Sequence, residues 1–422
     1  MINEELFREY QEYILNYNNK ELLLYSKNDY YYEYDKKEIR VRFNEENGVG
    51  VREFNSNGVI FEAYDGFSIS NLLNKKPRNR CELPFSNIVD SAACSRNINF
   101  EDINKMRIGY DEELTASDFA YQIIDKEKTR KSRVCKILYQ YQQENCILIN
   151  SKGVAGYYMK KLFSPSIIFE DKLIYDIYPE FDKEKWYNIW ELNCNKSLEV
   201  HAFQSKIEYI LLTPNVFGQI IYFLILGLQY NLVKLGKSKY KLDDIGKKMF
   251  SNAITMEENS NDNHSLEGNC DGVGLKRIPQ KIVKDGVITD FISSMVDGID
   301  GSGSSAYRLS YKQPPITKAS KVSVLSNISK KEFQKNYVDY LEITSLFGIN
   351  ESYNIANAQF SSNGDGIVYK NGKPIYRVEF NFIASVEDIL KEVICVLDEK
   401  KYVADGSIIT GAALVENKGF VC

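Results

Sequence analysis

The sequence predicts an α+β protein of two domains, and three observations support that prediction. The chain has 422 residues, more than one hydrophobic core ordinarily organises. Short runs of alternating apolar and polar residues recur in both halves, as half-buried antiparallel strands require. Helical periodicity is confined to a few segments. We therefore expect an N-terminal α+β domain with an antiparallel sheet over residues 1–198 and a strand-rich C-terminal domain over residues 199–422.

The first half should open with an amphipathic helix and continue as a strand meander. Apolar residues recur at helical spacing as far as Tyr17 among acidic residues, a pattern that does not suit a signal peptide. Strands should follow around Ile39 to Phe43, in VGVREF and in VIFEAY, separated by turns at NEENG and NSNG. The polar region from about 66 to 134 should hold one or two helices, one of them near residues 116–125. Further strands are expected in VCKILYQY, CILINS, GVAGYYMKKLF and SIIFEDKLIYDIY.

The most apolar stretch of the chain, NVFGQIIYFLILGLQY (215–230), is predicted to be a buried helix of the second domain. Extending it to the length of a membrane span would include a proline, an asparagine and a glutamine, which argues against a span. Pro214 suits the first helical turn, Thr213 the N-cap and Gly236 the far end.

Beyond this helix, a polar loop over residues 259–274 should lie at the surface or at an interface, because its composition does not build a core. Strands are expected in QKIVKDGVITDFISSMV and on both sides of a tight turn at Asn371 and Gly372. A helix from about Ser385 to Asp398 and a last strand near 408–414 should end the fold.

Composition narrows the class of partner. The net charge of -5 disfavours nucleic acid and anionic membranes, because both carry negative charge. Eight cysteines without a C-x-x-C pair or a compact framework suit free thiols in a reducing compartment. We therefore expect a cytoplasmic protein.

Several local sequence patterns could mark a catalytic or binding site, but for each of them an ordinary structural role is favoured. His264, Glu267, Cys270 and Asp271 fall close together and could hold a metal, but loops of this kind collect polar residues for turn geometry alone. The tract GSGSS (301–305) lacks the ending of a phosphate-binding loop. The basic run KEKTRKSR (126–133) is typical of an exposed charged surface. Neither of the two histidines has a visible partner for a Ser/His/Asp system.

Four segments in order resemble the TldD/PmbA family, also called TldD/TldE. They are INSKG (149–153), EGNCDGVGLKRIPQKIVKDGVITDF (267–291), GSSAYR (303–308) and the block at 345–393 that contains an NG turn. Three extra residues, 269–271, interrupt the family's E-G-V segment. Its counterpart is therefore either the pair at 267–268 or the triplet at 271–273, and no residue role is carried over. The resemblance makes five positions candidates for lining a peptide cavity or an interface: Glu267, Gly268, Gly303, Ser304 and Ser305.

TldD-type chains of that family carry an H-E-x-x-x-H helix and a late Cys-Gly-Lys segment that together bind zinc, whereas TldE-type chains lack both. Here the corresponding helix reads FGQIIYFLILG (217–227), without His or Glu, and the closing segment has no Cys-Gly-Lys. The resemblance thus implies a non-catalytic subunit with no cofactor of its own, paired with a TldD-like subunit that holds zinc and cuts unfolded or leader peptides. Two alternatives stay open: a stand-alone homodimeric peptide-binding protein without enzyme activity, and a hydrolase that uses the loop of His264 and Cys270.

Overall fold

The computed structural model describes residues 4–35, 38–74, 76–83, 121–122, 134–169, 173–179, 184, 186–188, 191, 198–203, 207–259, 266–297 and 303–421. The chain folds into two compact units. The first comprises residues 1–195, 265–278 and 293–318, and the second comprises residues 196–264, 279–292 and 319–422. Two segments of the second half of the sequence therefore return to the first unit. Of the helix expected near 116–125, only Tyr121 and Gln122 belong to the described residues.

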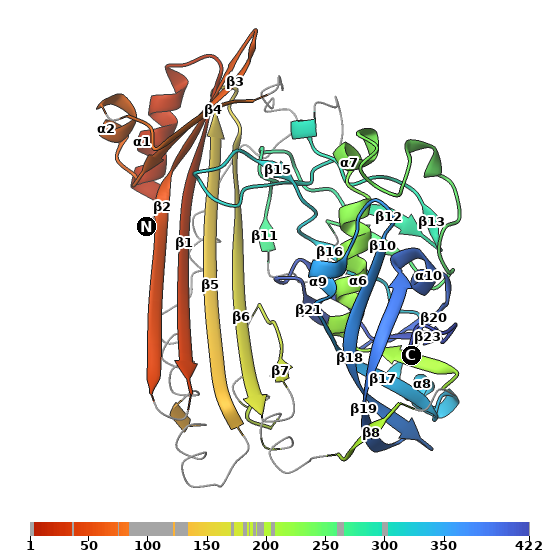
Figure 1. The fold of residues 1–422 in the computed structure, drawn as a ribbon. Coiled ribbons are helices and arrows are strands. Elements are labelled where there is room, and N and C mark those ends of the chain that lie inside the picture. Colours follow the sequence, from red (N-terminus) through yellow and green to blue (C-terminus); the bar gives the residue numbers. More distant parts are fainter. Residues whose placement is uncertain are drawn as a thin grey trace. The chain divides into compact units, whose positions relative to one another are not determined.

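The first unit is built on an eight-stranded antiparallel sheet in the order β11-β6-β5-β1-β2-β3-β4, with β7 also paired to β6. Its strands are β1 (Lys20–Tyr34), β2 (Ile39–Asn55), β3 (Gly58–Asp65), β4 (Asn79–Leu83), β5 (Val134–Asn150), β6 (Ala155–Phe169), β7 (Leu173–Tyr175) and β11 (Leu266–Gly268). The long strands β2, β1, β5 and β6 lie side by side in that order (Figure 1).

The length of these strands corrects the sequence reading. The predicted turn at NEENG was wrong, because Asn44 to Gly48 lie inside β2 and pair in continuous register with β1. VCKILYQY and the residues up to Asn150 of CILINS, which were expected as two strands joined by a turn, form one strand, β5. Strand β1 was not anticipated. Turn-forming residues are tolerated here because hydrogen-bonded neighbours and packing outweigh local preference.

One face of this sheet, which we call the helix face, is covered near one end by α1 (Glu4–Leu15). The amphipathic helix was predicted, and its buried stripe of Phe7, Tyr10 and Ile14 packs against Leu22 and Leu24 of β1. The short helix α2 (Ile69–Asn74) adds to the same cluster. The opposite face, on which Leu23 and Tyr25 project, is called the packed face because the two returning segments cover it.

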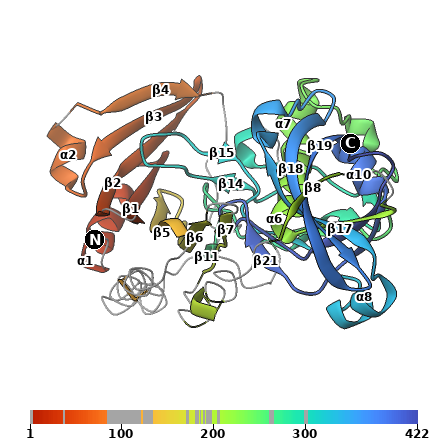
Figure 2. The ribbon, with the colours of Figure 1, turned by 60° about the horizontal axis from the view of Figure 1, so that its bottom comes forward.

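The second unit contains a mixed seven-stranded sheet in the order β20-β23-β9-β17-β18-β19-β8. Its strands are β8 (Val200–Ala202), β9 (Tyr209–Leu212), β17 (Tyr340–Phe347), β18 (Gln359–Lys370), β19 (Lys373–Ser385), β20 (Val393–Val396) and β23 (Ala413–Glu416). The expected tight turn joins β18 to β19, with positive φ angles of 51° at Asn371 and 71° at Gly372. These two strands run as a long hairpin (Figure 2).

A second, six-stranded sheet of this unit has the order β13-β12-β10-β16-β22-β21. Its strands are β10 (Met256–Glu258), β12 (Gln280–Lys284), β13 (Val287–Ile288), β16 (Val322–Val324), β21 (Lys401–Val403) and β22 (Ile408–Thr410). Helical elements of this unit besides α6 (Pro214–Gly227) include α7 (Tyr230–Lys234), η2 (Leu242–Asp244), α8 (Lys330–Asn336), α9 (Ile349–Ser352) and α10 (Val386–Lys391). The helix predicted at 385–398 is thus shorter than expected, because β20 begins at Val393.

The apolar stretch at 215–230 forms α6 (Pro214–Gly227), with Pro214 in the first turn as predicted. Thr213 occupies the N-cap position, but its hydroxyl makes no capping hydrogen bond. The helix belongs to a hydrophobic core that also contains residues from both sheets of the unit. The predicted α+β class is confirmed. No helix in the described part of the chain is both long and apolar enough to cross a membrane.

Candidate functional site

The two returning segments, residues 266–278 and 303–318, carry two of the stretches with family resemblance, and we call them the docked segments. The first adds β11 to the edge of β6, pairing Leu266 with Lys160 and Gly268 with Tyr158. In the second, the Leu309 carbonyl accepts a hydrogen bond of 3.0 Å from the Tyr25 hydroxyl of β1. The loop over 259–274, which was expected at the surface or at an interface, is buried in part against the sheet, since Cys270, Asp271 and Val273 are at most 1% exposed.

Glycines in the long strands make room for the docked segments. A Cβ atom at Gly48 of β2 would lie 2.2 Å from the Tyr311 ring, and one at Gly156 of β6 would lie 2.4 Å from the Cys270 sulfur. Both distances are far below van der Waals contact, so only glycine fits without movement of the neighbour. Gly48, the glycine that suggested a turn in NEENG, is thus needed inside the strand so that the Tyr311 ring can pack against it.

A buried charge triad joins the second docked segment to the packed face. Arg52 of β2 donates to both carboxylate oxygens of Glu21 at 2.8 and 2.5 Å, and Arg308 donates to Glu21 at 2.5 Å. All three side chains are at most 3% exposed. Arg308 also donates to the Gly272 carbonyl at 2.8 Å, while its Nη1 has no hydrogen-bond partner among the described residues. Burial lowers the pKa of Arg308 to about 10, and the positive charge of Arg52 acts in the same direction with a smaller effect.

Beside the triad lies a second buried polar group, formed by Glu144 and Cys146 of β5 with Tyr307 of the second docked segment. The Tyr307 hydroxyl lies 3.0 and 3.1 Å from the two Glu144 oxygens, and the Cys146 thiol donates to the same carboxyl at 3.7 Å. Burial raises the pKa of Glu144, and burial together with the Glu144 charge raises the pKa of Cys146 well above its ordinary value. A thiol with a raised pKa is a poor nucleophile. The group therefore suits packing and orientation better than covalent chemistry.

Asp271 ties the docked segments to each other. One of its carboxylate oxygens accepts the backbone N–H groups of Val273 and Leu275 at 3.0 and 2.9 Å, and the other accepts the N–H of Ala306 at 3.2 Å. Burial raises the pKa of this carboxyl, although the three hydrogen bonds act in the opposite direction. The conformation of the loop thus uses both oxygens of Asp271.

The residues predicted to line a peptide cavity fall into different environments. Glu267 is exposed, whereas Ser305 is fully buried. Gly268 has a φ of 145°, and a Cβ there would lie 2.4 Å from the Tyr157 carbonyl oxygen. The Gly303 N–H donates to the Ser293 hydroxyl at 3.0 Å. A role of these positions, or of Ser304, in binding peptide stays a prediction.

The metal alternative can be followed only in part, because His264 lies outside the described residues. Cys270 and Asp271 are buried and Glu267 is exposed. Among the residues that the structure describes, no group of three or more His, Cys, Asp or Glu is placed to hold a metal ion. The metal reading of this loop stays a prediction.

Helix α6 stands where the family resemblance implies a zinc-binding helix, and its side chains do not fit that ion. Its residues are apolar except for Asn215, Gln219 and Tyr222, and neutral amides and phenols are poor zinc ligands. Phe217, Ile220, Ile221 and Leu224 are fully buried in the core. No step of a zinc reaction is therefore assigned to this helix.

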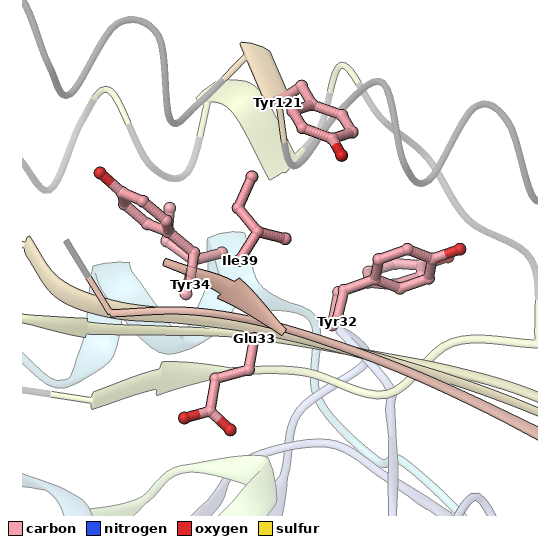
Figure 3. Close-up of a pocket in the computed structure, with 7 residues that line it drawn as sticks. Tyr32, Glu33, Tyr34, Ile39 and Tyr121 are labelled. Carbon is pink, nitrogen blue, oxygen red and sulfur yellow. The ribbon is translucent and has the colours of Figure 1, made fainter. Parts of the chain in front are cut away.

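A small pocket opens on the helix face of the first unit, away from α1. It is lined by Tyr32, Glu33 and Tyr34 of β1, Ile39 of β2, Ile137 and Tyr139 of β5, and Tyr121. Its empty volume is about 290 Å³, open solvent included. The Glu33 side chain points to the other side of the strand (Figure 3), where Lys136 pairs with it at 2.6 Å. The lining thus consists of aromatic rings and aliphatic side chains, which suit apolar packing.

Sequence reasoning missed the partners of the docked segments. In the sequence, these partners have the same pattern as ordinary solvent-facing residues of a strand. They are Glu21, Arg52, Glu144 and Tyr158. The available signal was the strand glycines, which indicate close approach of another backbone or side chain. They do not say which segment approaches.

Comparison with known families matches residues 206–420 to the PmbA/TldA metallopeptidase C-terminal domain. Since that match covers half of the chain, the chain belongs to the PmbA/TldD family, as the resemblance indicated. No curated protein matches it.

Three solved structures share the fold across nearly the whole chain. TldE from Thermococcus kodakarensis has a TM-score of 0.74 at 14% identity, with 97% of this chain and 98% of that chain covered. A candidate modulator of DNA gyrase from Thermotoga maritima gives 0.73 at 13% identity, covering 98% and 99%. Another candidate modulator of DNA gyrase, from Bacteroides thetaiotaomicron, has a TM-score of 0.72 at 14% identity, with 99% of this chain and 98% of that chain covered. At such identities the likeness establishes the fold alone.

Proposed function

We propose that this chain is the non-catalytic subunit of a zinc metallopeptidase complex that acts on unfolded or leader peptides. The observation that carries the proposal is α6, whose side chains pack in the core of the second unit and include neither a histidine nor a glutamate. Family membership supports the connection to peptidase chemistry. The fold shared with a TldE chain is the one this role requires, and the choice of subunit type rests on α6.

In this proposal a TldD-like partner subunit holds the zinc, which supplies polarisation of the peptide carbonyl and an activated water. This chain contributes walls of the shared peptide cavity and the backbone edges of its strands. Extended peptides can be held by main-chain hydrogen bonds at a strand edge, a mode that does not depend on side-chain sequence. We propose that the complex works in the cytoplasm, because eight cysteines without a C-x-x-C pair or a compact framework suit a reducing compartment.

Coexpression with a TldD-like chain from the same genome tests the proposal. We expect the two chains to copurify, zinc to follow the partner in stoichiometric amount, and an unfolded peptide to be cleaved by the complex but by neither subunit alone. A variant of the partner that lacks its zinc-binding histidines is the matched control. Stoichiometric zinc and peptide hydrolysis by this chain alone would overturn the proposal.

The same experiment separates the second candidate function, a stand-alone homodimeric peptide-binding protein. In that case the chain would bind unfolded peptide with no TldD-like chain present, and adding one would change neither binding nor cleavage.

A further inference from the structure

The docked segments cover one end of the packed face. The Tyr25 hydroxyl of β1 contacts the second docked segment there, and because side chains alternate along a strand, Asp29 and Tyr31 lie farther along on the same face. At the border of the covered part, Glu46 of β2 pairs with Lys312 at 3.1 Å. Beyond this border the face is formed by side chains of the four long strands.

Two rows of side chains beyond the border are fixed by the register of the strands. Each row takes one residue from β2, β1, β5 and β6 in that order. The first row is Asn44, Asp29, Gln142 and Leu162, and the second is Arg42, Tyr31, Gln140 and Ser164. The uncharged members that can form hydrogen bonds are called the polar strip: Asn44, Gln142, Tyr31, Gln140 and Ser164. Asn44 is exposed and the other four are half-buried, so the strip is accessible on this face.

The amide side chains of the polar strip have free hydrogen-bonding groups. Those of Asn44, Gln140 and Gln142 form no hydrogen bond with another residue that the structure describes. In the same row as Gln142, Asp29 pairs with Lys27 at 3.1 Å through Oδ2, while its buried Oδ1 has no partner among the described residues. Polar groups at such a place are ordinarily satisfied by water or by a ligand. The strip therefore offers donors and acceptors that are not used in holding the sheet together.

The charged side chains around the polar strip are largely paired. Besides the ion pairs already given, Glu33 binds Lys136 at 2.6 Å at the far border. The guanidinium carbon of Arg42 lies 5.9 Å from the centre of the Tyr31 ring. The face therefore carries little unbalanced charge, and a polyanion such as nucleic acid would meet no run of free cations on it. A peptide backbone is neutral and alternates donors with acceptors, which is the pattern that amide side chains complement.

The dimensions of the strip suit a short extended segment. Neighbouring strands lie about 4.8 Å apart, so β2, β1, β5 and β6 together span about 14 Å across the rows. An extended peptide rises about 3.3 Å per residue, so about four of its residues cross the strip. Such a segment runs at right angles to the strands and contacts their side chains, which distinguishes this mode from the addition of a strand at a sheet edge.

We propose that the polar strip binds the backbone of an extended, unfolded peptide that crosses the four long strands. The side-chain NH2 groups of Gln140 and Gln142 donate to peptide carbonyls, and the free Oδ1 of Asp29 accepts from a peptide N–H. Recognition of this kind uses the main chain, so it does not depend on the side chains of the peptide. The inference rests on the proposed function, because it names the surface of this chain that holds the substrate of the complex.

The test compares leucine and glutamate at the same two positions, in the complex with a TldD-like partner. Gln140→Leu/Gln142→Leu nearly keeps the volume of both side chains and removes their hydrogen bonds. KM for an uncharged unfolded peptide of Ser, Ala and Thr residues should therefore rise at least about fivefold. The value of kcat should stay unchanged, because the reacting groups belong to the partner. Relative to the wild type, Gln140→Glu/Gln142→Glu should raise KM for an acidic peptide and lower KM for a basic one.

Gln11→Leu/Gln334→Leu is the matched control, because it makes the same two substitutions at exposed positions of α1 and α8. It should leave KM unchanged, and circular dichroism should show that every variant is folded. A second measurement does not need cleavage. With p-benzoylphenylalanine in place of Tyr31, irradiation should crosslink the chain to the same peptide, either alone or in the complex, whereas the same group in place of the exposed Leu15 should not.

The outcomes separate this inference from the proposed function. If the wild-type complex cleaves peptide, an unchanged KM in the leucine variant, glutamate variants without the opposite shifts, or no crosslink at position 31 would each overturn the inference alone. Crosslinking of position 31 to the partner subunit would also overturn it, because the face would then be part of the subunit contact. A wild-type complex that does not cleave peptide refutes the proposed function, and the crosslink at position 31 then decides the inference by itself.

Discussion

Removing Glu21 should destabilise the first unit far more than removing Arg308, although the two side chains bind each other. Glu21 is the only carboxylate that the structure shows between the two buried arginines of the triad, with Arg52 held at 2.8 and 2.5 Å and Arg308 at 2.5 Å. In Glu21→Gln, two guanidinium groups stay in a region that is at most 3% exposed without their counter-ion. In Arg308→Met, the bidentate pair of Glu21 and Arg52 stays complete.

The magnitudes follow from these contacts. Breaking a buried ion pair by removing one partner costs about 3–5 kcal/mol, because the other charge is left uncompensated, and we expect a loss of this size for Glu21→Gln. Arg308→Met loses hydrogen bonds and leaves the Gly272 carbonyl without its side-chain donor, which costs about 1–3 kcal/mol. It also removes a guanidinium whose Nη1 has no partner among the described residues, which offsets part of that loss.

Tryptophan fluorescence during urea unfolding measures the loss of unfolding free energy in the first unit, which contains the triad. The chain has two tryptophans, Trp186 and Trp190, and Trp186 is fully buried in the first unit. Glu53→Gln is the control, because the Glu53 side chain is 51% exposed and its ion pair with Lys20 at 3.4 Å should contribute less than about 1 kcal/mol. Equal losses for Glu21→Gln and Arg308→Met, or a larger loss for the arginine, would refute the reasoning that one carboxylate balances two cations.

Three further predictions use the same fluorescence signal. Gly156→Ala should lower the unfolding free energy by about 1–3 kcal/mol, because the new Cβ meets the Cys270 sulfur, and adding Cys270→Ala should recover part of that loss in a non-additive double-mutant cycle. Burial raises the pKa of Glu144 above its ordinary value of 4.5, so the native state binds more protons than the unfolded state above that pH, and stability falls as pH rises through this window. Glu144→Gln should therefore gain stability relative to the wild type as the pH rises above 4.5, and a constant difference would contradict the assignment. Asp271→Asn should cost about 1–3 kcal/mol, because an amide NH2 replaces one of the two acceptor oxygens, and a loss no greater than that of Glu53→Gln would show that the loop does not depend on both.

The fold class and the hairpins could be predicted from sequence because their signals are local. Asn371 and Gly372 adopt positive φ as an NG turn requires, and Pro214 begins a helix that is apolar all round and buried. The long strands could not be predicted in the same way. Asn44 to Gly48 have the composition of a turn, but they are kept extended by β1, which pairs with them over their whole length.

The buried polar groups of the first unit were beyond sequence reasoning because their members are far apart in the chain. Glu21 and Arg308 are 287 residues apart, and Glu144 and Tyr307 are 163 residues apart. Each of these residues alone has the pattern of a solvent-facing strand or loop position. Which of them meet is decided by the return of the docked segments to the first unit.

Two residues within the stretches of family resemblance, Asp271 and Arg308, are occupied in holding the docked segments in place. Asp271 uses both carboxylate oxygens on backbone N–H groups, and Arg308 uses its guanidinium on Glu21 and on the Gly272 carbonyl. A resemblance in such residues predicts how the chain folds, and it would arise equally in subunits with and without catalytic activity. Catalytic and non-catalytic subunits must therefore be distinguished by positions whose residue type the fold does not require. Helix α6 is such a position, because any apolar set of the right volume can pack there, whereas only a specific set of histidine and carboxylate ligands can bind zinc.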